Sequence, residues 1–264
     1  MWRSRSTVCA ALCILIAGLC ATPASRSAEE RPAVPILVYH RFGPTVADSM
    51  TVTTAVFDEQ LAWLRTHDYR IIPLRALLDS LHNPANPVPP RAVVITVDDG
   101  HESVYRELLP RLRRERFPVT LFIYPSAISN ADYALTWPQL AEIRDTGLVD
   151  VQSHTYWHPN FHRERARLSA DAYRALAMTQ LTQSRDLIAR QLGGPVDLLA
   201  WPFGIHDAQL EQWAREAGYV AAFTLERRAA SRDDDPLALP RYLMTDADRG
   251  ARFAAIVERG SRRP

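Results

Sequence analysis

Residues 92–100 read Ala-Val-Val-Ile-Thr-Val-Asp-Asp-Gly, a run of small and β-branched side chains that ends in two carboxylates and a glycine. A near-continuous apolar run of this length is typical of a strand buried on both faces of a parallel sheet. Asp and Gly are also favoured in ordinary turns, so the stretch alone leaves that explanation open. Two adjacent carboxylates repel each other when both are ionised, and a nearby metal or arginine would explain why Asp98 and Asp99 stand together.

Short apolar runs and helix-like segments alternate through most of the chain. We expect strands near residues 36–39, 71–72, 92–97, 119–123, 149–152, 198–201, 219–223 and 239–243. We expect helices near residues 74–81, 102–116, 137–146, 170–192, 207–217 and 249–257, and another that Thr54 caps. This alternation predicts the α/β class, with a parallel sheet covered by helices. Seven or eight units without a glycine-rich nucleotide loop favour a (β/α)7–8 barrel over an open sheet.

The carboxyl ends of the expected strands carry the polar residues. In a parallel barrel these ends converge on one face, where active sites lie. The segments at or just past the strand ends are Tyr39-His40, Asp98-Asp99, Ser153-His154, Trp201-Pro202 and Arg241. We therefore expect side chains that are distant in the sequence to meet in one site.

The first residues have the layout of a secretory signal peptide. Arg3 and Arg5 precede an apolar run over residues 8–19, which is short for a transmembrane span, and small residues follow. Cleavage is expected near Ala24, with Ala28 as an alternative. We divide the chain into a signal peptide at 1–24, an N-terminal linker at 25–33 and one catalytic domain at 34–264. The protein is therefore predicted to be exported to the periplasm or beyond the cell, with peripheral or no membrane association after cleavage.

Cysteine content and charge exclude several kinds of function. All three cysteines, Cys9, Cys13 and Cys20, fall inside the expected signal peptide, so the mature chain would have no thiolate ligand and no cysteine nucleophile. The formal net charge of the 264 residues is only +1, which predicts no nucleic-acid partner. Any transition metal would have to be held by histidine and carboxylate side chains.

A second motif supplies two imidazoles. Residues 153–158 read Ser-His-Thr-Tyr-Trp-His, which places His154 and His158 four positions apart. Their ring nitrogens would reach one point if residues 155–157 form a helical turn, although two unrelated histidines could have the same spacing. With one carboxylate of the aspartate pair they would form a three-ligand metal site with an open position, and the other carboxylate would remain as a base.

Together, Thr96-Val97-Asp98-Asp99-Gly100 and Ser153-His154-Thr155-Tyr156-Trp157-His158 resemble the first two motifs of the polysaccharide deacetylases, the NodB-homology family or carbohydrate esterase family 4. The resemblance covers nearly all of the mature chain. It implies a distorted (β/α) barrel and metal-dependent removal of acetyl groups from N-acetylated sugars. It also implies that Asp98 is the catalytic base and that Asp99, His154 and His158 bind a divalent metal, with Zn²⁺ favoured and Co²⁺ or Ni²⁺ as alternatives.

The chain departs from the family at its third motif. The family usually has Arg-x-Pro-Tyr, whereas residues 200–203 read Ala-Trp-Pro-Phe. The resemblance implies that the backbone N–H of Phe203 stabilises the oxyanion, and we expect Trp201 and Pro202 to line the substrate site beside it. The missing arginine normally orients the base. Arg241, in Leu-Pro-Arg-Tyr-Leu at residues 239–243, is the candidate replacement, and a plain surface ion pair is the alternative for it.

The general acid is also displaced. The family's C-terminal Leu-x-His is missing, since no histidine follows His206. Residues 35–40, Pro-Ile-Leu-Val-Tyr-His, are similar to the start of the poly-N-acetylglucosamine deacetylase branch, in which this early histidine acts as the acid. We therefore expect His40 to protonate the leaving amine, with His206 as a weaker competitor. A core histidine paired to backbone is the structural alternative for His40.

These assignments predict a metal-dependent polysaccharide N-deacetylase that hydrolyses linear amides. The expected partner is an N-acetylated polysaccharide, with poly-β-1,6-N-acetylglucosamine favoured and peptidoglycan or chitin as alternatives, and the expected state is a monomer. Trp137, Trp157 and Trp201 could stack on sugar rings, although core packing is the default for tryptophan. Two other classes are a non-catalytic glycan-binding relative and another metallo-hydrolase on a similar barrel, such as a two-metal phosphodiesterase, which needs more ligands than we find.

Overall fold

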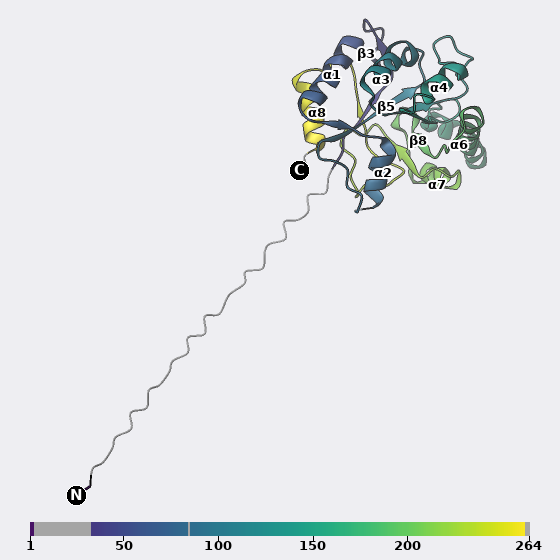
Figure 1. Ribbon diagram of the computed structural model, residues 1–264. Helices are drawn as coiled ribbons and strands as arrows, with labels where there is room; N and C mark the ends of the chain where they lie inside the picture. Colours follow the sequence, from purple (N-terminus) through teal and green to yellow (C-terminus); the bar gives the residue numbers. More distant parts are fainter. Residues whose placement is uncertain (3–32, 84, 262–264) are drawn as a thin grey trace. The chain divides into compact units, whose positions relative to one another are not determined.

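The computed structural model describes residues 1–2, 33–83 and 85–261 (Figure 1). The predicted signal peptide beyond its first two residues, the three cysteines and most of the predicted linker lie outside this range. The division at residues 24 and 33 therefore stays a prediction. Among the described residues, no helix is both long enough and apolar enough to cross a membrane.

Strands and helices alternate along the described chain. The strands are β1 (Ile36–Tyr39), β2 (Arg41–Gly43), β3 (Thr51–Thr53), β4 (Arg70–Ile71), β5 (Ala92–Asp99), β6 (Val119–Ile123), β7 (Val149–Ser153), β8 (Leu198–Ala200), β9 (Ala221–Phe223) and β10 (Tyr242–Leu243). The helices are α1 (Thr54–Thr66), α2 (Leu74–His82), α3 (Leu109–Glu115), α4 (Trp137–Arg144), α5 (Phe161–Arg167), α6 (Ala170–Leu192), α7 (Ala208–Glu216) and α8 (Ala251–Ser261). A π-helix (Val104–Leu108) precedes α3, and a short 3₁₀ helix (Pro202–Gly204) follows β8.

Eight strands form one parallel sheet in the order β10-β1-β5-β6-β7-β8-β9, with β4 paired to the start of β5. The strands β2 and β3 form a separate parallel pair. Every residue of β5 except Asp99 is buried, as expected for a central strand covered on both faces. The predicted α/β fold with a curled, barrel-like parallel sheet is confirmed.

One short segment connects the two edges of the curled sheet. Leu239 forms a parallel bridge with Phe223 of β9, and Tyr242 pairs with Leu37 of β1. The prediction of one continuous strand at residues 239–243 is therefore wrong, because the segment pairs first with β9 and then with β1. Arg241 lies at this crossing, and its side chain is fully buried.

Apolar side chains fill both faces of the sheet. One cluster includes the inner faces of several strands and three leucines of α2, namely Leu74, Leu77 and Leu78 with Ile36, Val94, Phe122, Leu198 and Phe223. The helices α1, α3 and α4 contribute to a second cluster and α6 and α7 to a third, on the other side of the strands (Figure 1). The polar ends of the strands are thus left as the place where chemistry can occur.

Helix starts follow local capping chemistry. The Thr136 hydroxyl accepts from the Gln139 N–H and the Gln139 side chain bonds back, which forms a capping box at the start of α4. At the start of α6 the Ser169 hydroxyl accepts from the Ala172 N–H, and at the start of α7 the Asp207 carboxylate accepts from the Gln209 and Leu210 N–H groups. The α1 cap is Thr53, one residue before the expected Thr54. The single helix expected at residues 102–116 instead begins as a π-helix, a form often found near functional sites.

Gly100 combines a left-handed backbone with close packing, so its replacement should disturb the fold. Its φ is +76°, and an added Cβ would lie 2.9 Å from Ile123 Cγ2, whereas Gly194 has φ +80° and open space around it. We expect Gly194→Ala to cost about 1–2 kcal/mol of unfolding free energy from the left-handed backbone alone. Gly100→Ala should cost about 1–3 kcal/mol more, because overpacking is added to the same strain. Urea unfolding of both variants measures this difference, and equal losses would contradict the packing argument.

Candidate functional site

Asp98 and Arg241 form a buried ion pair at the carboxyl end of β5. The Arg241 Nη1 donates to Asp98 Oδ1 (2.8 Å) and Nη2 donates to Oδ2 (2.7 Å), so the contact is bidentate. Nε of the same arginine donates to the carbonyl of Thr224 (3.1 Å) and Nη1 also reaches the Thr96 hydroxyl (3.2 Å). The guanidinium is therefore fixed on all sides, and it holds the carboxylate plane in one orientation.

The charge of Arg241 determines the protonation of Asp98. Burial by itself raises the pKa of this carboxyl, but the arginine charge, the neighbouring His154 and the arginine hydrogen bonds together lower the pKa of Asp98 to about 2. The rings of Phe122 and Phe223 lie 5.5 and 5.9 Å from the guanidinium carbon and complete its surroundings. Asp98 is thus an ionised carboxylate that can accept hydrogen bonds, and its arginine partner is packed against aromatic rings.

Asp99, His154 and His158 form a group that can hold a metal ion. Asp99 Oδ1 lies 3.7 Å from His154 Nε2 and 3.8 Å from His158 Nε2, and all three ligand atoms lie within 4.8 Å of one another. His154 Nδ1 lies 2.7 Å from the Ala200 carbonyl, to which it can donate, so that Nε2 keeps its lone pair. Burial, and then the His154 charge, lower the pKa of His158 to about 4, which favours the neutral imidazole that a metal requires. Two nitrogens and one carboxylate oxygen are the donors of an open zinc-type site.

The two imidazoles do not meet through a helical turn. The residues between them form no helix, and both Thr155 and His158 have φ +64°. The expected helical turn over residues 155–157 is therefore wrong. The two histidines instead lie in a loop in which the Ser153 hydroxyl accepts from the Thr155 N–H and the Thr155 hydroxyl accepts from the His158 N–H.

A pocket of about 180 Å³ opens beside these residues. Its lining consists of His40, Met50, Asp98, Asp99, His154, His158, Trp201, Phe203, Leu225 and Leu243. Apolar side chains from β10 and from the loops after β2 and β9 share this lining with the ligand group and Asp98. Such a pocket has room for a small acyl group next to a base and a metal.

His40 lines this pocket directly after β1. It is 9% exposed, and its buried Nδ1 has no hydrogen-bond partner among the described residues. The alternative explanation for His40, a core histidine whose ring is paired to backbone, is therefore not supported at Nδ1. Burial lowers the pKa of the imidazole, while the charges of Asp98 and Asp99 act in the opposite direction.

The residues of the third motif differ in how they contribute to the pocket. Phe203 lines the pocket with φ +58°, its ring lies 4.6 Å from that of His158, and 57% of the residue is exposed. Trp201 touches the pocket but is fully buried, and its indole N–H donates to the Leu237 carbonyl. Pro202 is buried and does not line the pocket. His206 also lies outside the lining and contacts Glu211 at 2.7 Å.

Several residues of this site were not identified from the sequence. Met50, Leu225 and Leu243 line the pocket, and the Ala200 carbonyl fixes the His154 tautomer. A methionine or leucine in a loop carries no distinguishing pattern, because its role depends on contacts made by the folded chain.

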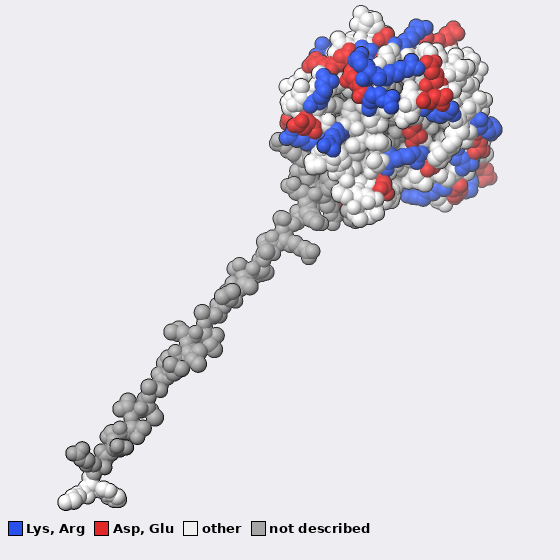
Figure 2. All heavy atoms as spheres, viewed as in Figure 1, with Lys and Arg blue, Asp and Glu red and all other residues white. Residues whose placement is uncertain are grey.

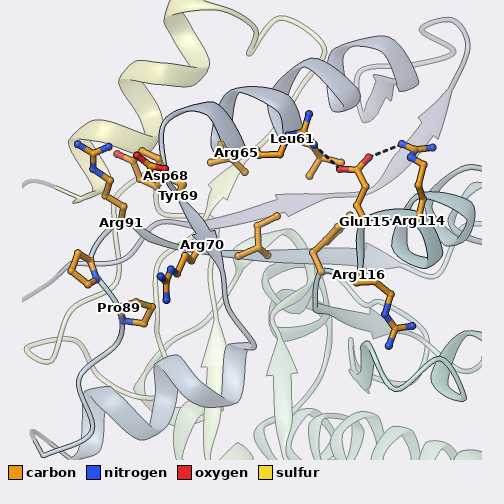
Figure 3. Close-up of a pocket in the computed structure, with 14 residues that line it drawn as sticks. Leu61, Arg65, Asp68, Tyr69, Arg70, Pro89, Arg91, Arg114, Glu115 and Arg116 are labelled. Atoms are coloured by element: carbon orange, nitrogen blue, oxygen red, sulfur yellow. Dashed lines mark hydrogen bonds and ion pairs between the residues drawn. The ribbon is translucent and has the colours of Figure 1, made fainter.

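A second cavity, of about 1070 Å³, lies at the other end of the sheet (Figure 3). Arg91 directly precedes β5 there, and Glu115 forms ion pairs with Arg65 and Arg114. Its described lining contains no histidine, and among the described residues only Asp99, His154 and His158 form a potential metal group. The catalytic chemistry is therefore assigned to the smaller pocket, which the potential metal group lines.

On the face of the molecule seen in Figure 2, acidic and basic side chains are interleaved.

Comparison with known proteins gives the same assignment of fold. The model of the family described as polysaccharide deacetylase matches residues 85–222. The poly-β-1,6-N-acetyl-D-glucosamine N-deacetylase of Staphylococcus aureus (strain MRSA252) is 24% identical over 200 residues, which cover 74% of this chain and 68% of that protein. The protein of the same name from Staphylococcus epidermidis is 25% identical over the same shares.

Two solved structures share the fold. The Streptococcus pyogenes deacetylase PplD, in complex with acetate, superposes with a TM-score of 0.76 at 22% identity, covering 86% of this chain and 99% of that one. IcaB from Ammonifex degensii gives a TM-score of 0.74 at 23% identity, with 86% and 97% covered.

Removing Arg241 should leave Asp98 as an unpaired buried charge. We expect Arg241→Met to lower the unfolding free energy of the metal-free protein by about 3–5 kcal/mol. Asp98→Asn in the same chain should recover part of this loss, because the stranded charge is then removed. Arg106→Met is the matched control, since Arg106 pairs with Glu102 while 67% exposed and should contribute about 0–1 kcal/mol. If the unfolding free energy lost in the double variant equals the sum of the losses in the two single variants, Asp98 and Arg241 are not coupled, and the prediction is contradicted.

Proposed function

We propose a specific activity for this chain, which belongs to the polysaccharide deacetylase family and is therefore a hydrolase that acts on amide bonds of N-acetylated carbohydrate. The proposal is metal-dependent removal of N-acetyl groups from poly-β-1,6-N-acetylglucosamine. The observation that carries it is the ligand group Asp99, His154 and His158, which lies beside a base, Asp98, that Arg241 holds in place. The pocket beside them has room for a small acyl group.

The metal would be held by Asp99, His154 and His158. When bound, such an ion polarises a carbonyl oxygen and acidifies a water molecule. Zn²⁺ suits two imidazoles and one carboxylate, and Co²⁺ or Ni²⁺ are alternatives with similar preferences. The residues fit this role because the His154 tautomer is fixed and the neutral form of His158 is favoured.

Asp98 is proposed as the base. Its carboxylate lies 3.9 Å from His154 Nε2, so a water at the ligand group is within its reach. Asp98 takes a proton from that water as the water attacks the acetyl carbon, and Arg241 keeps the carboxylate directed toward it. The backbone N–H of Phe203 donates to the developing oxyanion, a contribution of about 3–4 kcal/mol when such a donor is well placed.

His40 is proposed as the acid. The C–N bond of the tetrahedral intermediate breaks when the nitrogen receives a proton, because an unprotonated amine is a poor leaving group. His40 enters the pocket from β1 and donates that proton, so acetate and a free amine leave. The pairing of His206 with Glu211 outside the pocket disfavours the competing assignment.

The choice of polymer rests on the relatives. The two staphylococcal proteins at 24–25% identity are named poly-β-1,6-N-acetyl-D-glucosamine N-deacetylases, and the segment that ends in His40 is similar to that branch. Peptidoglycan and chitin remain alternative substrates. Export, a monomeric state and peripheral or absent membrane association belong to the same proposal. A two-metal phosphodiesterase is disfavoured because the described residues offer a single ligand group.

Acetate release from a panel of glycans tests the activity. The wild-type protein should release acetate from poly-β-1,6-N-acetylglucosamine faster than from chitin oligomers or peptidoglycan, and a chelator should abolish release until Zn²⁺ is restored. Asp98→Asn should lower kcat by about 10²–10⁴-fold, because the base is lost while the metal ligands remain. Release that a chelator does not affect, or full activity of Asp98→Asn, would refute the mechanism.

Leaving-group chemistry tests the acid. We expect His40→Ala to lower kcat/KM on the N-acetylated glycan by about 10²–10⁴-fold. The same variant should hydrolyse 4-nitrophenyl acetate nearly as well as wild type, because the phenolate leaves without a proton. His206→Ala is the matched control and should retain both activities. Equal losses of His40→Ala on both substrates would show that His40 does not act as the acid.

A further inference from the structure

The catalytic end of the sheet carries an unusual set of exposed rings. Between residues 33 and 261, leaving out residue 84, three aromatic side chains are largely exposed: Tyr133 (44%), Trp157 (48%) and Phe203 (57%). The loops that hold them follow β6, β7 and β8, which are neighbours in the sheet. The three rings, here called the aromatic rim, therefore lie along successive strand ends beside the catalytic pocket.

Each residue of the rim is anchored through its ring or its backbone. The Tyr133 hydroxyl lies 2.9 Å from that of Tyr124, and its ring stacks on His101 with an interplanar angle of 15°. The Tyr133 carbonyl also accepts from the Glu102 N–H, which ties this loop to the chain just after Asp99. Tyr133 is thus positioned against the same loop that supplies a metal ligand.

The other two residues are anchored near the histidine ligands. The Trp157 backbone N–H donates to the side chain of Gln180, a fully buried residue of α6, at 2.9 Å, so the main chain under this ring is anchored. The Phe203 ring contacts His158 edge-on, with centroids 4.6 Å apart. Aromatic side chains have few rotatable bonds and lose little conformational entropy when a ligand covers them, and exposed apolar surface of this kind marks a binding site.

We propose that the aromatic rim forms subsites on which sugar rings adjacent to the reacting residue stack. The apolar face of a sugar ring covers the aromatic face while its hydroxyl groups stay in water. A chain that follows the rim occupies several strand ends at once, so the enzyme acts on internal residues of a polymer in preference to a monomer. This inference rests on the proposed function and adds the origin of its preference for polymer.

Chain-length kinetics test the rim. The substrates are N-acetylglucosamine, β-1,6-linked oligomers of increasing length, the polymer and 4-nitrophenyl acetate. Trp157→Ala and Tyr133→Ala should each lower kcat/KM on the polymer about tenfold, mainly through KM, and should flatten its dependence on chain length. Hydrolysis of 4-nitrophenyl acetate should not change, since this small ester reaches only the pocket. Phe203 is left unchanged because it contacts His158.

Val220→Ala is the matched control, because Val220 is 55% exposed and directly precedes β9, at the amino end of that strand, whereas the rim lies at the carboxyl ends of the strands. Calorimetric titration of chelated protein with an oligomer gives a readout that needs no turnover, and both rim variants should bind it about tenfold more weakly than wild type and Val220→Ala. Unchanged polymer kinetics and binding in the rim variants would overturn the inference alone. Wild-type protein that cleaves the ester but releases no acetate from any glycan would overturn the proposed function and the inference together.

Discussion

The paired charges of Asp98 and Arg241 impose the constraint on which the site depends. A buried carboxylate is costly unless a partner satisfies it, and a buried guanidinium is equally costly alone. Here each removes the cost of the other, although 143 positions separate them in the sequence. The segment around Arg241 crosses from one sheet edge to the other, and from this crossing its side chain reaches the end of β5.

Backbone strain gathers around the same centre. Asp99, Thr155, His158 and Phe203 all have positive φ, a conformation that residues with a side chain adopt at a cost. Two of them are proposed metal ligands, one lies between the ligands, and one carries the proposed oxyanion donor. A regular helix or strand would direct these side chains apart. The strained turns bring the ligand atoms to within 4.8 Å of one another beside one small pocket, and the packed sheet beneath them supports that strain.

Sequence patterns predicted the parts of this molecule that depend on local order. The apolar run of β5, the alternation of elements and the limits of α6 follow from periodicity and capping, and the motif residues Asp99, His154 and His158 do lie together. The turn between the two histidines was mispredicted, because left-handed Thr155 and His158 are not glycines and give no signal. Met50 and Leu225 were missed because their place in the pocket depends on tertiary contacts alone. The roles of His40, Arg241 and Phe203 remain predictions that the geometry permits.

The position of Arg241 has a consequence for timing. A polypeptide is made from its first residue onward, so Asp98 and both histidines are synthesised well before Arg241. A chain that ends before Arg241 has the three ligand residues and Asp98, but it lacks the guanidinium that orients this carboxylate. The segment that directs the proposed base is therefore the same segment that joins the two edges of the sheet.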